Sequence, residues 1–284
     1  MTLTPHPGGA EALWRADLGD RQVALAWLGQ AGFAIRLGGL RMLIDPYLSD
    51  FLAQKYAGKE FAHVRMMPPP LDATRLRDLD LVLCTHRHSD HMDYGCLSTL
   101  AANNPACRFV VPRAEIDSAQ KAGLALDRLL PAGDGQTLPA GPQAEVLAIP
   151  SAHETLATDH QGNHRYLGYV LRLAGLTLYH SGDCVVYPGQ ADRLRATGVD
   201  LALLPVNGRS ERLTARGLPG NMTFDEAAAL CRQASIRTLI PHHFGMFEFN
   251  TVDPAELERQ AARLDYADLT CVIPRIDLYY TLAP

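Results

Sequence analysis

Short apolar runs separated by glycine-containing turns dominate the first third of the chain. Such runs are typical of β-strands, and they predict an antiparallel meander at residues 23–28, 32–37 and 40–44. A further apolar run at residues 79–84 is typical of a buried strand. Between the meander and this strand, residues 46–70 form an irregular connection, and loops of this length are often functional lids.

The remaining two thirds of the chain alternate between helical and strand-like patterns. Apolar spacing and terminal Gly or Pro predict helices at 92–102, 113–122, 189–197, 223–234 and 254–264. Strands are predicted at 108–111, 144–149, 166–173, 176–180, 200–206, 237–241, 270–273 and 276–282. Two halves, each with strands first and helices afterwards, favour two sheets packed face to face with helices outside. Without a repeat or linker, we expect one domain over residues 1–284.

Composition narrows the class of protein. Hydrophobic residues make up 47% and charged residues 20% of the chain, as in ordinary soluble enzymes. The net charge of −5 gives no electrostatic reason to expect nucleic acid or an anionic membrane as a partner. The six cysteines form no Cys-x-x-Cys pair and no signal-peptide pattern opens the chain, so we expect reduced thiols in a cytoplasmic protein.

The side chains that carry chemistry gather directly after the strand at 79–84. His86, His88, Asp90 and His91 lie within six positions. In an extended segment His86 and His88 point the same way and can hold one ion, whereas Asp90 and His91 diverge and can reach a second ion. The cluster therefore favours two metals over one. The alternative is a polar loop with several surface histidines.

Three later strand ends supply further ligands. His153 follows one apolar strand and is a candidate third nitrogen for the first ion. Asp183 follows another strand and could place a carboxylate between both metals. His242 and His243 follow a third, and one of them can complete the second ion. The other histidines lack such a context, and we expect surface or loop positions for His6, His63, His160 and His164.

Taken together, these residues resemble the metallo-β-lactamase superfamily. Its His-x-His-x-Asp-His signature stands here at 86–91, and the contexts of Asp183 and His243 match the later motifs. The resemblance covers nearly the whole chain. It implies an α+β fold, a four-layer αββα sandwich of two mixed sheets with helices outside, and metals at one edge between the sheets.

Within the superfamily the chain is most similar to the L-ascorbate-6-phosphate lactonase-like branch. The similar stretches are residues 27–32, 179–183, 221–223 and 240–243. The branch usually presents Pro-x-His, which implies His243 as the ligand and leaves His242 beside the ligands or facing the substrate. The lactonase differs at residues 151–153, where His153 here restores the general superfamily ligand, and in the connection before the histidine cluster. These differences leave the substrate open. The lactonase relatives also imply a homo-oligomer.

We therefore expect a metal-dependent hydrolase with two divalent ions, zinc or manganese, with iron possible. The first ion is assigned to His86, His88 and His153, the second to Asp90, His91 and His243, with Asp183 as the bridge. A hydroxide bridging the two metals would attack the substrate, with Asp90 and Asp183 as the catalytic carboxylates. Neither Cys84 nor Cys184 is needed as a ligand, although both lie close to ligands in the sequence; small buried hydrophobes are the simpler interpretation.

The expected reaction is the opening of a lactone or ester of a small molecule, which a sugar-phosphate lactone would fit. Arg209, in the polar loop at 207–221, is the candidate for binding a phosphate, because guanidinium groups suit bidentate phosphate recognition; an ordinary solvated loop is the alternative. A small-molecule phosphodiesterase with the same metal centre is the second hypothesis. A di-iron redox protein usually needs an added flavin domain, and a non-catalytic metal-binding protein usually lacks some of the ligands.

Overall fold

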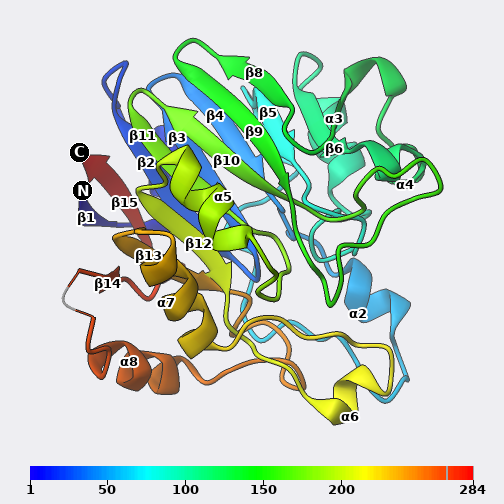
Figure 1. The fold of residues 1–284 in the computed structure, drawn as a ribbon. Helices are drawn as coiled ribbons and strands as arrows, with labels where there is room; N and C mark the ends of the chain where they lie inside the picture. Colours follow the sequence, from blue (N-terminus) through cyan, green and yellow to red (C-terminus); the bar gives the residue numbers. More distant parts are fainter. Residues whose placement is uncertain (267, 284) are drawn as a thin grey trace.

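Two β-sheets form the inner layers of the protein (Figure 1). The computed structural model describes residues 1–266 and 268–283. The first sheet has the strand order β1 (Thr2–Pro7), β15 (Leu278–Ala283), β2 (Val23–Gly29), β3 (Gly32–Leu37), β4 (Leu40–Ile44), β5 (Leu81–Leu83), β6 (Arg108–Pro112) and β7 (Leu129–Ala132). The second has the order β14 (Thr270–Cys271), β13 (Thr238–His242), β12 (Leu201–Pro205), β11 (Leu176–His180), β10 (Leu167–Leu173), β9 (Ala144–Pro150) and β8 (Thr137–Gly141).

Both sheets are mixed. In the first sheet β2, β3 and β4 form the predicted antiparallel meander, and the pairs from β4 to β7 are parallel. In the second sheet β8 to β11 are antiparallel, and the pairs from β11 to β14 are parallel. Parallel neighbours end at the same edge of a sheet, which is where ligands bind in open α/β sheets.

The central strands β2 and β3 of the first sheet are buried on both faces. In β2, Val23, Leu25 and Trp27 pack into the core between the sheets, while Ala24 and Leu28 pack into the outer core. This alternation follows from the two-residue period of a strand, and burial on both sides explains the unbroken apolar run.

Helices cover the outer face of each sheet, which confirms the predicted four-layer α+β sandwich. The first sheet carries α1 (Gly9–Arg15), α3 (Leu97–Asn103) and α4 (Ile116–Lys121). The second carries α5 (Gln190–Thr197), α7 (Phe224–Gln233) and α8 (Pro254–Ala262). Two short helices, α2 (Phe51–Lys55) and α6 (Glu211–Thr214), lie in long loops, and two 3₁₀ turns occupy Arg113–Glu115 and Leu126–Arg128. Among the described residues, no helix is long and apolar enough to span a bilayer.

Some elements differ from the predicted ones. The sequence pattern does not predict β1, because prolines and mostly exposed side chains remove the apolar alternation from this edge strand. It also leaves out α1, α2, α6, β7 and β8. The helix predicted at 92–102 begins only at Leu97, because the preceding turn folds around Asp93, whose carboxylate accepts the N–H of Gly95. The helix predicted at 113–122 opens with a 3₁₀ turn, and its α-helical part ends at Lys121.

Candidate metal centre

The expected ligands converge where strands from both sheets end. β5 leads into His86 and the histidine cluster, in which the N–H groups of His91 and Met92 both bond to the carbonyl oxygen of His88 and so tighten the turn. β9, β11 and β13 lead into His153, Asp183 and His243 respectively.

A glycine is required where β11 turns into the site. Gly182 has φ +62°, and a Cβ there would lie 2.6 Å from the hydroxyl oxygen of Thr85. Its lack of a side chain therefore lets the loop that carries Asp183 approach the loop of the histidine cluster closely.

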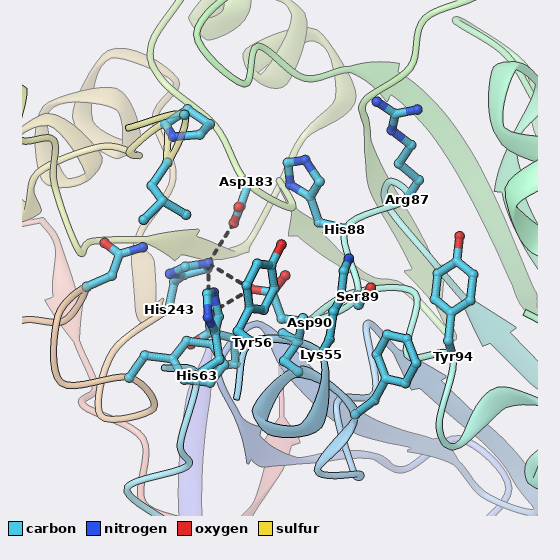
Figure 2. Close-up of a pocket in the computed structure, with 18 of the residues that line it drawn as sticks. Lys55, Tyr56, His63, Arg87, His88, Ser89, Asp90, Tyr94, Asp183 and His243 are labelled. Atoms are coloured by element: carbon cyan, nitrogen blue, oxygen red, sulfur yellow. Dashed lines mark hydrogen bonds and ion pairs between the residues drawn. The ribbon is translucent and has the colours of Figure 1, made fainter. Parts of the chain in front are cut away.

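Seven potential ligands form two adjacent groups. In the first group the ligand atoms of His86, His88, His153 and Asp183 all lie within 4.8 Å of one another, and in the second those of Asp90, His91 and His243 do. Asp183 links the groups, because its Oδ1 lies 3.2 Å from His91 Nε2 and 3.1 Å from His243 Nε2, while its Oδ2 lies 3.7 Å from His153 Nε2. Figure 2 shows Asp183 facing His243, with His88 and Asp90 close by.

The donor atoms suit divalent metal ions. Nε2 of His86 is buried and makes no hydrogen bond, whereas Nε2 of His91 and Oδ1 of Asp183 lie 3.2 Å apart. Leaving a buried polar atom unpaired costs about 1–3 kcal/mol, and a bound metal would remove this cost. All seven potential ligands offer nitrogen or oxygen, the donors that zinc, manganese and iron accept.

The two groups differ in charge. Burial lowers the pKa values of His86 and His88, and lowers that of His153 to about 4, so these imidazoles are neutral. Burial also opposes charge on His91 and His243, but the neighbouring carboxylates, Asp183 foremost, outweigh it: the pKa of His91 lies well above its ordinary value and that of His243 is raised to about 9. The first group is therefore ready to bind a metal, while the second holds protons that a metal must displace.

Neighbouring side chains orient the ligands. Asp45, directly after β4, accepts a hydrogen bond from His91 Nδ1 at 2.7 Å and from the N–H and hydroxyl groups of Thr85. Gln30, in the β2–β3 turn with φ +50°, donates from Nε2 to Asp90 Oδ2 at 2.8 Å. The carbonyl oxygen of Gln30 accepts the N–H of His243.

A cavity of about 540 Å³ opens over the centre. Five of the seven potential ligands line it: His88, Asp90, His153, Asp183 and His243. Aromatic rings and cationic side chains line the rest, and the segments that carry them include the loop predicted to be a lid.

The structure does not bring two expected substrate-binding residues into this cavity. Arg209 makes a bidentate ion pair with Glu226 and bonds to the carbonyl oxygen of Asn221, in a separate hollow. His242 is fully buried and its ring stacks on that of His180. Neither side chain lines the cavity over the metal centre. The expectation that Cys84 and Cys184 are buried thiols agrees with their full burial and raised pKa values.

Three residues of the site escape the sequence analysis. Asp45 stands before Pro46 at a strand end, a position that could have suggested it, and Gln30 stands in a tight turn between two strands. His63 lies in a loop, one of the two positions expected for it, but it is not a surface residue: it is only 8% exposed and lines the cavity. Its ring is buried by Tyr56 and by two phenylalanines far away in the sequence, so no local signal reveals it.

Comparison with known proteins agrees with this geometry. Residues 40–244 match the family model described as the beta-lactamase superfamily domain. A UPF0173 metal-dependent hydrolase of Rubrobacter xylanophilus is 28% identical over 247 residues, covering 84% of this chain and 89% of the relative. A UPF0173 metal-dependent hydrolase of Opitutus terrae is 29% identical over 243 residues, covering 84% of this chain and 92% of the relative.

Solved structures show the same fold. The isothiocyanate hydrolase from Delia radicum gut bacteria superimposes with a TM-score of 0.72 at 18% identity, covering 90% of this chain and 97% of that one. The metallo-beta-lactamase fold protein YhfI from Bacillus subtilis superimposes with a TM-score of 0.66 at 16% identity. The match covers 92% of this chain and 99% of that one.

Proposed function

Because this chain belongs to the beta-lactamase superfamily and is a metal-dependent hydrolase, we propose that it opens the ester bond of a small-molecule lactone or related ester. The similarity to the lactonase-like branch supports a lactone, with a sugar-phosphate lactone as one candidate. Zinc and manganese are the metals we propose, with iron as a further option. Six cysteines without a disulfide support a cytoplasmic protein.

The two groups of ligands define the proposed metal sites. His86, His88 and His153 would hold one ion, Asp90, His91 and His243 the other, and Asp183 would contact both. When bound, two divalent ions supply Lewis acidity and a nucleophile at neutral pH. The protein contributes a fixed set of donors, since Asp45 and Gln30 hold His91 and Asp90 in place.

Asp90 has a further role in this proposal. Burial would raise the pKa of its carboxyl group, but His91 and His243 hold that pKa far below its ordinary range, so the group stays ionised at neutral pH. Its side chain is 16% exposed and lines the cavity. With Oδ2 held by Gln30, the carboxylate can accept a hydrogen bond from the attacking water and orient it toward the substrate.

The observation that carries the proposal is the pair of donor groups, joined by Asp183, at the base of the cavity. The test measures the metal content of protein purified without added metal, then hydrolysis with and without chelator. The substrates are sugar lactones, their phosphates and bis(p-nitrophenyl) phosphate. We expect about two equivalents of metal and chelator-sensitive lactone opening. Turnover of the phosphodiester alone would identify the protein as a phosphodiesterase instead. Less than one equivalent of bound metal after metal is added back would overturn the dinuclear centre.

A further inference from the structure

The cavity over the metal centre carries cationic side chains that have no counter-charge. Lys55 at the end of α2, Arg87 in the histidine cluster and Lys121 at the end of α4 all line it. None of the three forms an ion pair with a carboxylate of the described residues. Figure 2 shows Lys55 and Arg87 in the same close-up as His88 and Asp90.

The arginines of the loop at residues 207–221, unlike these three cations, form ion pairs with carboxylates. Arg209 pairs with Glu226, while Arg212 and Arg216 both pair with Glu60. Each of these arginines therefore has a carboxylate partner, although Arg212 and Arg216 share one. The unpaired positive charge near the reaction site belongs to Lys55, Arg87 and Lys121 instead.

The carboxylates of the cavity cannot neutralise these cations. Asp90 and Asp183 line it, but both already interact with the histidines of the metal centre. Bound divalent ions would add further positive charge. A cavity with this excess of one sign concentrates ligands of the opposite sign, even though the whole chain has a net charge of −5.

Aromatic rings form another wall of the same cavity. His63 stacks on Tyr56 with ring centroids 4.3 Å apart, and Phe247 and Phe249 meet His63 at 4.9 Å and 4.8 Å. Nδ1 of His63 bonds to the carbonyl oxygen of Phe61, which fixes the ring. This wall offers apolar surface to the body of a ligand whose charged group lies against the cations.

We propose that Lys55, Arg87 and Lys121 form an anion subsite beside the metal centre, and that the substrate carries a phosphate or carboxylate group attached to an apolar body. This inference rests on the proposed function in that it names the substrate class of the same site. It moves the phosphate-binding role from Arg209 to three residues on α2, the histidine cluster and α4.

The test is equilibrium binding to the metal-loaded protein, measured by calorimetry. The probes share one aromatic body and differ in charge: benzylphosphonate, phenylacetate and benzyl alcohol. The variants are Lys55→Gln, Arg87→Gln, Lys121→Gln and the triple variant. Lys59→Gln is the matched control, because Lys59 lies over the same Tyr56 ring as Lys55 but does not line the cavity.

Exposed charge pairs are worth at most about 1 kcal/mol each, so we expect about three- to five-fold weaker binding of the anionic probes per substitution. The triple variant should lose ~30- to 100-fold, with unchanged metal content. The affinity of Lys59→Gln for the anionic probes should stay within about two-fold of the wild-type value. Benzyl alcohol should bind equally weakly to every protein. Added salt should weaken the binding of the anionic probes to the wild-type protein more than their binding to the triple variant. Tighter binding of benzylphosphonate than of phenylacetate identifies phosphate as the preferred group, and the reverse identifies carboxylate.

Equal binding of both anions by wild type and the triple variant, at equal metal content, would overturn the subsite. Because binding is measured without turnover, this outcome is separate from a failure of the proposed lactone hydrolysis.

Discussion

Nδ1 of His91 lies 2.7 Å from Oδ2 of Asp45, and both side chains are completely buried. The two residues are 46 positions apart and meet because β4 and β5 are parallel neighbours that end together. With Nδ1 bonded to a carboxylate, Nε2 of His91 is presented to the second group of ligands. A carboxylate behind a histidine fixes its orientation and raises its basicity toward a metal.

Asp45→Asn should therefore weaken the second metal site. The substitution preserves shape but removes the negative charge, and loss of such a partner typically costs about 10- to 100-fold in metal affinity. Competition with a chelator measures the effect, and the first equivalent of metal should be nearly unaffected. Equal affinity of the variant and wild type for both equivalents would contradict this role.

Metal binding should depend on pH through His91 and His243. In the metal-free protein their raised pKa values mean that the protonated forms stabilise the fold below the ordinary histidine pKa of about 6.5. That contribution is lost as pH rises through the folded values, about 9 for His243. Metals compete with these protons, so the difference in Tm between metal-loaded and chelator-treated protein should grow from pH 6.5 to pH 9. A difference that stays constant over this range would count against the assignment.

The two equivalents of metal should also release different numbers of protons. The histidines of the first group are neutral because burial lowers their pKa values, as in His153, whereas His91 and His243 in the second group are protonated at neutral pH. Calorimetric titration in two buffers of different ionisation enthalpy measures the release. We expect little release for the first equivalent and about two protons for the second.

Asp90→Asn should remove most turnover and leave the fold intact. The amide matches the carboxylate in size but cannot supply its charge to a metal or to an attacking water. We expect kcat to fall at least ~100-fold, with an unchanged circular dichroism spectrum. Asp50→Asn is the control, since Asp50 is an exposed carboxylate outside the cavity. Full activity of Asp90→Asn with both metals bound would refute the catalytic role.

Arg209→Ala should change stability rather than substrate choice. It removes an ion pair with Glu226 and a hydrogen bond to the carbonyl oxygen of Asn221. Because the pair is partly exposed, we expect a loss of no more than about 1–2 kcal/mol in the free energy of unfolding. KM for phosphorylated and unphosphorylated lactones should change alike, and a selective rise for the phosphorylated one would restore the original expectation for Arg209.

Much of the site could be predicted from the sequence because its ligands follow strands. An apolar run identifies a buried strand, and His86, His153, Asp183 and His243 each stand just beyond such a run. β9, β11 and β13 run in the same direction within the second sheet and so end at the same edge, and β5 reaches this edge from the first sheet. The same reasoning predicted the two sheets, since burial on both faces makes the inner strands continuously apolar.

Only the tertiary structure decided what surrounds these ligands. The contact of Asp45 with His91, the burial of His63 and the pairing of Arg209 with Glu226 each join residues that no local period connects. A charged side chain on a loop looks the same in the sequence whether it faces a carboxylate or an open cavity. Its chemistry depends on which distant segment packs beside it, and that is settled only when both sheets and their loops have assembled.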